Sequence, residues 1–326
     1  MPSKSRGSNG AVQSDVESGA ELDRATHAVE EAVLDALWRQ WAAVGASATA
    51  VGPARAVVDP EALVMASLWF LDREPRLEDL LASWVISNGA LLSVQRLRNV
   101  AHLFPDVAKD RVNRVARLAV ERGRDFRWKP LVRHEVSALV ERQGKKLSIA
   151  VPLERPSAVM LRIRALLGVG MRADVISYMA SADTDFVTAD DVAKATAYNG
   201  TAVRRLLVQL ANAGGLHSDR TSTITRYSIR GSSLAHVAVK RPSARSRWRF
   251  TAQVFAAVTE FLEWRRTTRR RTVSPFAVAV KGDELFDKYE WALVAAGAIA
   301  RGSASGVQRT WPNHLTALAE WLQAVI

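Results

Sequence analysis

The chain has 326 residues, a formal net charge of +12 and no cysteine, which excludes disulfides and thiolate metal sites. Hydrophobic residues make up 48% of the chain, which excludes wholesale disorder and suits about two or three domains. No apolar run reaches the length of a membrane-spanning helix, so the composition predicts a cytoplasmic protein without a membrane segment. The excess of basic residues favours a polyanionic partner, nucleic acid first and an acidic membrane surface second.

The first part of the chain predicts a helical domain behind a polar tail. Residues 1–20 lack the apolar centre of a signal peptide and are expected to be disordered. Residues 21–140 then show helical apolar spacing, beginning with a long amphipathic helix over 21–45. Asp59-Pro60-Glu61 predicts a helix start, with a cap, a proline in the first turn and an acidic side chain beside it. The tryptophans are expected to be core anchors: Trp38, Trp41, Trp69 and Trp84.

A set of basic residues between 93 and 122 has two interpretations. A solvated helix surface is favoured over a second DNA-binding face for Arg96, Arg98, Lys109, Arg111, Arg114, Arg117 and Arg122. After this domain, residues 141–156 carry two prolines and a Gly-Lys-Lys run with poor helical periodicity. They are expected to be a linker.

Residues 157–234 predict a second domain. A short helix over 157–167 precedes a helix that begins near Arg172, and Thr188 is a good N-cap for the next one. Thr201 opens a further helix, whose buried stripe has the spacing i, i+3, i+4 and i+7: Val203, Leu206, Leu207 and Leu210. Two short β patterns follow, over 216–218 and 223–229, joined by a polar turn.

This order of three helices and a β-hairpin resembles the winged helix-turn-helix domain of bacterial transcription regulators. The run Thr201-Ala202-Val203-Arg204-Arg205-Leu206-Leu207, followed by Ala213-Gly214, carries the resemblance. Gly215 is an extra residue relative to that pattern. The resemblance implies that the helix opened by Thr201 enters the major groove and that the hairpin is the wing. Winged helices also serve as protein-contact modules, so this fold alone does not establish DNA binding.

The exposed face of the predicted recognition helix has side chains suited to reading bases. Arginine pairs with guanine and glutamine with adenine, so the candidate DNA-binding residues there are Thr201, Ala202, Arg204, Arg205 and Gln209. On the predicted wing, Arg220 and Arg226 are candidates for the minor groove or a phosphate. The alternative is that Arg204 and Arg205 form surface ion pairs with Asp190 or Asp191. DNA contact is favoured because these polar positions converge where the resemblance places them.

The last region, residues 235–326, predicts a helical bundle with a basic segment. Between Lys240 and Arg271 there are ten basic residues and two acidic ones. Helices are expected over about 249–266, 283–297 and 313–325, suited to dimer or partner contacts. Candidate phosphate contacts are Arg265, Arg266, Arg269, Arg270 and Arg271, with favourable placement at a helix C-terminus as the alternative explanation.

No catalytic, cofactor or metal motif is evident. The six histidines are scattered without metal-ligand spacing. Asp183-Thr184-Asp185 lacks the surrounding residues of a nucleotidyltransferase, and no nucleophile elbow is present. The sequence therefore predicts a protein that is not an enzyme and needs no cofactor.

The sequence predicts a mainly α protein: an N-terminal helical domain, a central winged helix and a C-terminal helical region. The favoured hypothesis is a transcription regulator that binds double-stranded DNA as a homodimer. The alternative is an antitoxin-like or other protein-interaction component of a bacterial defence or toxin–antitoxin system, whose helical domain binds a partner protein. Whether the N- and C-terminal helices pack as one domain is open from the sequence.

Overall fold

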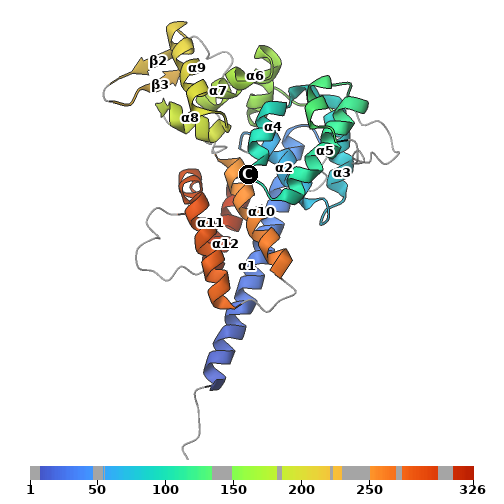
Figure 1. Cartoon of the computed structure of the whole chain (residues 1–326), viewed down its shortest axis with the longest axis vertical. Helices are drawn as coiled ribbons and strands as arrows, with labels where there is room; N and C mark the ends of the chain where they lie inside the picture. The colour runs from blue at the N-terminus through green and yellow to red at the C-terminus, as the bar shows by residue number, and fades with distance from the viewer. Residues whose placement is uncertain are drawn as a thin grey trace, which may run out of the picture.

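The computed structural model describes residues 8–46, 54, 56–133, 149–181, 186–220, 223–229, 250–268, 274–299 and 311–326. The protein is mainly α (Figure 1). In the N-terminal half, the helices are α1 (Ser8–Ala43), α2 (Pro60–Phe70), α3 (Arg76–Asn88), α4 (Val94–Ala101) and α5 (Asp106–Glu121). Short 3₁₀ segments are η1 (Gly89–Leu91), η2 (Phe126–Leu131) and η3 (Pro156–Ala158). None of the helices in the described ranges is long and apolar enough to cross a membrane.

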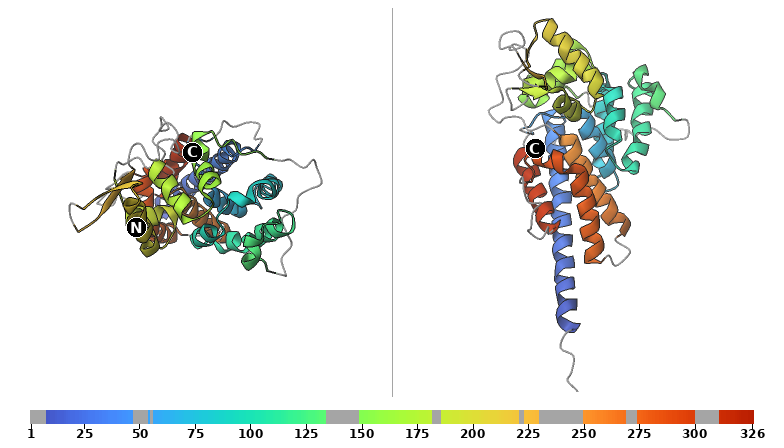
Figure 2. Two further views of the ribbon diagram at one scale, coloured as in Figure 1. Left: turned by 90° about the horizontal axis from the view of Figure 1, so that it is seen from above. Right: turned by 60° about the vertical axis from the view of Figure 1, so that its left-hand side comes forward.

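The helices from the two ends of the chain share one hydrophobic core. The C-terminal helices are α10 (Thr251–Thr268), α11 (Pro275–Ala296) and α12 (Trp311–Val325). α1 packs along α12, and α10 packs against α2 and α11, so the first and last helices lie side by side (Figures 1 and 2). This answers the question left open by the sequence. We call this assembly, α1–α5 with α10–α12, the helical body.

Tryptophans anchor the helical body, as expected from the sequence. Trp41 and Trp84 are each 1% exposed, and their rings meet edge to face with 5.6 Å between centroids. Their indole N–H groups are satisfied inside the core, since Trp41 donates to Ser67 Oγ at 3.0 Å and Trp84 to the Val44 carbonyl at 3.2 Å. Trp69 is also buried, and Trp38 packs partly buried against the same core.

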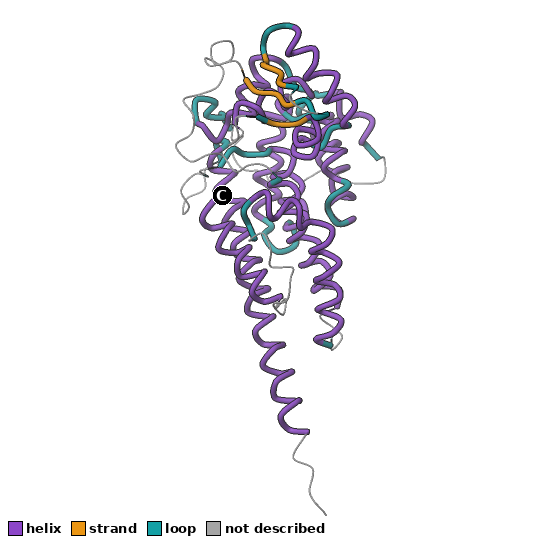
Figure 3. Tube along the Cα trace, turned by 90° about the vertical axis from the view of Figure 1, so that its left-hand side faces the viewer, coloured by secondary structure: helices purple, strands orange, loops and turns teal. Residues whose placement is uncertain are grey.

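Helix α1 begins earlier than expected. The predicted disordered tail extended to residue 20, whereas α1 starts at Ser8, and residues 1–7 lie outside the described ranges. The N-terminal turns of α1 project beyond the other helices (Figures 1 and 3). A helix that is already nucleated by packing adds each further residue at little cost, because nucleation is the unfavourable step. The polar composition of residues 8–20 therefore did not prevent the helix from continuing.

A second, smaller core lies at the opposite end of the molecule from the projecting part of α1. It is built by α6 (Val159–Leu167), α7 (Met171–Ser181), β1 (Val187–Thr188), α8 (Ala189–Thr196), α9 (Gly200–Asn212), β2 (Leu216–Asp219) and β3 (Arg226–Ile229). The strands form an antiparallel sheet in the order β1-β3-β2, visible as the strand cluster in Figure 3. Val187 pairs with Tyr227, and Leu216 with Ile229. We call Met171–Ile229 the α7–β3 module.

Local capping explains where the helices of the module begin. Thr188 and Asp191 form a reciprocal capping box at the start of α8, as the sequence indicated for Thr188. Asn199 caps α9 by accepting hydrogen bonds from the backbone N–H groups of Thr201 and Ala202, so α9 starts at Gly200. The two-residue strand β1 was not predicted, because a strand of that length leaves no periodic pattern.

Two other predicted segments differ in extent. α11 begins at Pro275 rather than near residue 283, since Ser274 caps it and the proline occupies its first position. In the predicted linker, residues 141–148 lie outside the described ranges, while Ile149 is buried and its carbonyl accepts a hydrogen bond from Asn88. The domain boundaries proposed from the sequence stay predictions.

Candidate nucleic-acid interface

Helix α9 separates a buried stripe from an exposed polar face. Val203, Leu206 and Leu207 are buried in the smaller core. The 3.6-residue period then turns Thr201, Arg204, Arg205 and Gln209 outward, and all four are exposed. We call these four residues the α9 face. Ala202, the remaining candidate on this helix, is half-buried.

The arginines of the α9 face are not neutralised within the described part of the chain. Asp190 forms an ion pair with Lys194 at 2.7 Å, and Asp191 is engaged in the capping box with Thr188. The structure therefore does not show the alternative, in which Arg204 and Arg205 pair with these two carboxylates. In the described ranges neither guanidinium has an ion-pair partner, so both can meet an external anion.

The β2–β3 hairpin adds two exposed arginines next to α9. β2 follows α9 after a short turn. In the sheet register, Arg226 on β3 lies opposite Asp219 on β2 and Thr188 on β1. Arg226 and Arg220, the residue after β2, are both exposed. Residues 221–222 of the turn lie outside the described ranges. The α9 face and this hairpin thus lie in one module, at one end of the molecule (Figure 1).

The two described arginines of the other predicted basic group, Arg265 and Arg266, do not lie at this end. α10 is about 27 Å long, its first turns lie beside α8, and Arg265 and Arg266 lie in its last turn. Arg265 forms an ion pair with Asp23 of α1, and Arg266 pairs with Glu263 at 3.0 Å and Asp72 at 3.4 Å. The remaining candidates, Arg269, Arg270 and Arg271, lie outside the described ranges.

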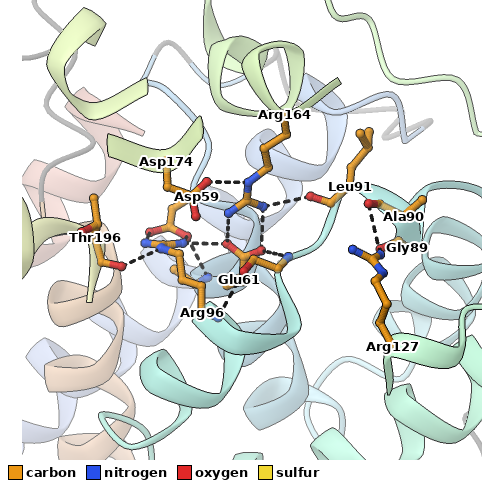
Figure 4. A network of polar contacts seen from close by, with 12 residues as sticks. Asp59, Glu61, Gly89, Ala90, Leu91, Arg96, Arg127, Arg164, Asp174 and Thr196 are labelled. Carbon is orange, nitrogen blue, oxygen red and sulfur yellow. Dashed lines mark hydrogen bonds and ion pairs between the residues drawn. The ribbon is translucent and has the colours of Figure 1, made fainter. Parts of the chain in front are cut away.

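Between the module and the helical body lies a cluster of buried ions, centred on Glu61 (Figure 4). Arg164 of α6 donates to both carboxylate oxygens of Glu61, at 2.7 and 2.9 Å, and to Asp174 of α7 at 2.7 Å. Arg96 of α4 donates to Glu61 at 2.7 Å and, through two nitrogens, to Asp59 at 2.5 and 2.6 Å. All five side chains are at most 2% exposed. We call these five residues the ion cluster.

The ion cluster reaches the turn between α8 and α9. Arg96 Nε donates to the carbonyl of Thr196 at 2.9 Å, as Figure 4 shows, and Asn99 Nδ2 donates to the carbonyl of Ala197 at 2.9 Å. The Tyr198 hydroxyl donates to Asp174 at 2.8 Å and lies 3.3 Å from Ser93 Oγ. Three consecutive residues before the cap of α9 are thus held by groups outside α8 and α9.

Electrostatics keep Glu61 and the two arginines of the ion cluster charged. Burial alone would raise the pKa of Glu61, but the guanidiniums of Arg164 and Arg96 lower it to about 2. Burial would likewise lower the pKa of each arginine, yet the neighbouring carboxylates raise it above its usual value. For Tyr198, burial and the charge of Asp174 both raise the pKa, so its hydroxyl stays protonated and remains a donor.

The ion cluster overturns one expectation from the sequence. Arg96 was assigned to a solvated helix surface, but it is fully buried. The helical period places Arg96 and Val100, four residues apart, on the same face of α4, and this signal could have indicated burial. Arg111 and Arg114 are part-buried and pair with Asp72 and Glu78, whereas Arg98 is exposed as expected. Asp59 and Glu61 marked a helix start correctly, but their second role depends on partners distant in the sequence.

Two further observations concern metal binding and the relation of the chain to known proteins. Among the described residues, no group of three or more His, Asp or Glu side chains is placed to hold a metal ion. Comparison of the chain with protein-family models, curated proteins and solved structures found no match. The function must therefore be inferred from the chemistry of the α9 face and the residues that support it.

Proposed function

We propose that the protein is a transcription regulator that binds duplex DNA by placing α9 in the major groove. The observation that carries this proposal is the α9 face, where two exposed arginines without partners in the described chain stand beside Thr201 and Gln209. Arginine and glutamine present paired donors or acceptors that match guanine and adenine edges.

The architecture around α9 supports the same proposal. The order α7-β1-α8-α9-β2-β3, with β1 paired to the hairpin, agrees with the winged helix that the sequence resembles. In that domain the hairpin lies beside the DNA backbone, so Arg220 and Arg226 are suited to contact phosphates or the minor groove. The net charge of +12 favours association with a polyanion.

In this account the protein acts in the cytoplasm as a homodimer, and the target is double-stranded DNA. Phosphate contacts supply affinity that depends on salt, and the α9 face supplies the preference among sequences. The protein is not an enzyme and uses no cofactor.

A binding assay with a matched control tests the proposal. Duplexes selected by the protein from a random pool are compared with scrambled duplexes by fluorescence anisotropy across a range of salt concentrations. We expect Arg204→Ala/Arg205→Ala to weaken binding to the selected duplex at least about 30-fold, because each base contact contributes about 1–3 kcal/mol. The control, Arg98→Ala/Arg133→Ala, removes two exposed arginines from outside the module. It should leave the preference for the selected duplex unchanged.

Two results would contradict the proposal. One is equal, weak binding of selected and scrambled duplexes at physiological salt. The other is a double variant of the α9 face that retains the full preference. Either result would favour the alternative, a component that binds a partner protein through its helical domain.

A further inference from the structure

Two carbonyls of the turn before α9 accept hydrogen bonds from the helical body. Ala197 has a φ of +58°, in the left-handed region that residues with a side chain rarely adopt. The carbonyls on either side of this conformation are held from α4, by Arg96 at Thr196 and by Asn99 at Ala197 itself. Such a conformation persists when surrounding groups hold it in place.

The next residue along the chain, Tyr198, is held by its side chain, which lies 3.3 Å from Ser93 Oγ at the start of α4. Tyr198 is 6% exposed, and its hydroxyl bonds to Asp174 within the ion cluster. Asn199 follows directly and caps the first turn of α9. The position of the α9 face, which begins at Thr201, is therefore set by residues that are anchored on α4 and in the ion cluster.

We propose that Arg96, Asn99 and Tyr198 are positioning residues that fix the start of α9 relative to the helical body for reading DNA. This inference rests on the proposed function. Base recognition requires side chains held close to their productive geometry, whereas phosphate contacts tolerate a looser helix. A loosened turn therefore lowers affinity for the preferred duplex more than affinity for other duplexes, because ordering must then occur on binding.

A second contact between the helical body and the module provides a matched control. Gln253 of α10 donates to the carbonyl of Lys194 at 3.1 Å, and the Lys194 ammonium lies over the Trp291 ring of α11 at 5.4 Å. This contact ends on α8 rather than on the turn. Gln253→Met thus removes a hydrogen bond between the same two parts of the molecule without removing a support of the turn.

The test uses mild variants of the full chain, because Arg96 variants risk unfolding the protein. Asn99→Ala and Tyr198→Phe each remove hydrogen bonds of the turn, and Tyr198→Phe keeps the buried ring. Hydrogen exchange of the free protein is measured over residues 196–206, after thermal unfolding has established conditions in which all variants are folded. We expect exchange there to accelerate roughly 3- to 10-fold in both variants and to stay unchanged in Gln253→Met, as one lost hydrogen bond implies.

DNA binding is the second measurement on the same samples. We expect the ratio of affinities for selected and scrambled duplexes to fall by a similar factor in Asn99→Ala and Tyr198→Phe. A simple loss of folded protein would reduce the active fraction and leave this ratio unchanged.

The two measurements separate the two hypotheses. Unchanged exchange in both turn variants, or equal acceleration in Gln253→Met, would overturn the positioning role even if DNA binds. If the exchange result is as expected but wild-type protein does not distinguish the duplexes, the turn is held as inferred and the proposed function is wrong. An unchanged affinity ratio in a wild type that does discriminate would overturn the role in DNA reading.

Discussion

Arginine serves opposite purposes in the ion cluster and on the α9 face. In the ion cluster, Arg96 and Arg164 are 0% exposed at their side chains, and each meets two carboxylates. On α9, Arg204 and Arg205 are exposed, and neither has an ion-pair partner within the described ranges. A guanidinium whose donors are already used within the protein cannot bind a ligand, whereas an exposed one remains available. The difference separates residues that position the candidate interface from residues that form it.

Removal of the carboxylate that Arg96 and Arg164 share is expected to have the largest effect on stability. Glu61→Ala leaves two buried guanidiniums without their common partner, and we expect it to lower the free energy of unfolding by about 3–5 kcal/mol. Urea unfolding followed by circular dichroism measures the loss. Glu31→Ala is the control, because its pair with Arg73 is half-exposed and should contribute about 1 kcal/mol or less. Similar losses in both variants would contradict the central place given to Glu61.

Acid should weaken the ion cluster by protonating Glu61. The pKa of Glu61 is about 2 in the folded protein against an ordinary value of 4.5. Between these values the unfolded chain binds more protons than the folded one, so the contribution of Glu61 is complete above pH 4.5 and is lost toward pH 2. The urea concentration at the midpoint of unfolding should therefore decrease as the pH is lowered from 4.5 toward 2. Glu61→Gln should reduce the slope, and an unchanged slope would show that other carboxylates cause it.

A smaller effect on stability is expected from loss of the cap at the start of α9. Asn199→Ala removes the side chain that accepts hydrogen bonds from Thr201 and Ala202, so we expect a loss of about 1 kcal/mol in the free energy of unfolding. Binding to the preferred duplex should weaken as well, since the first turn carries part of the α9 face. Thermal unfolding and anisotropy measure the two effects, and Asn199→Ser should restore both.

The smallest effect is expected at the far end of α10. Arg266 already pairs with Glu263 and Asp72 and is 49% exposed, so Arg266→Ala should cost about 1 kcal/mol or less. DNA affinity should change by less than about twofold, because a paired guanidinium has little to offer a phosphate. A loss as large as that of Arg205→Ala would support the phosphate-binding role that the sequence suggested for residues 265–271.

Local patterns predicted much of the α7–β3 module. The stripe of Val203, Leu206 and Leu207 identified the buried side of α9, and Thr188 marked the start of α8 through capping alone. These features depend on residues within about two turns of one another, where spacing and side-chain chemistry are sufficient.

The ion cluster could not be predicted in the same way. Arg96 meets Thr196, 100 residues later, and Arg164 meets Glu61, 103 residues earlier. Residue type alone cannot distinguish buried Arg96 from its exposed neighbour Arg98. Only the four-residue spacing from Arg96 to Val100 indicated that Arg96 lies on the buried face of α4. The shared core of the first and last helices depends on the same kind of distant contact. Tertiary packing determined both.

Directed cleavage of bound DNA tests the central claim, that α9 lies in the groove, most directly. The chain has no cysteine, so a single introduced thiol can carry an iron–EDTA reagent at one known position. Asn212→Cys places it at the exposed end of α9, and Arg24→Cys places it on α1. The account predicts cuts clustered beside the selected site from Asn212→Cys and none from Arg24→Cys. Cuts from the α1 position alone, or no cuts from the α9 position on fully bound DNA, would contradict it.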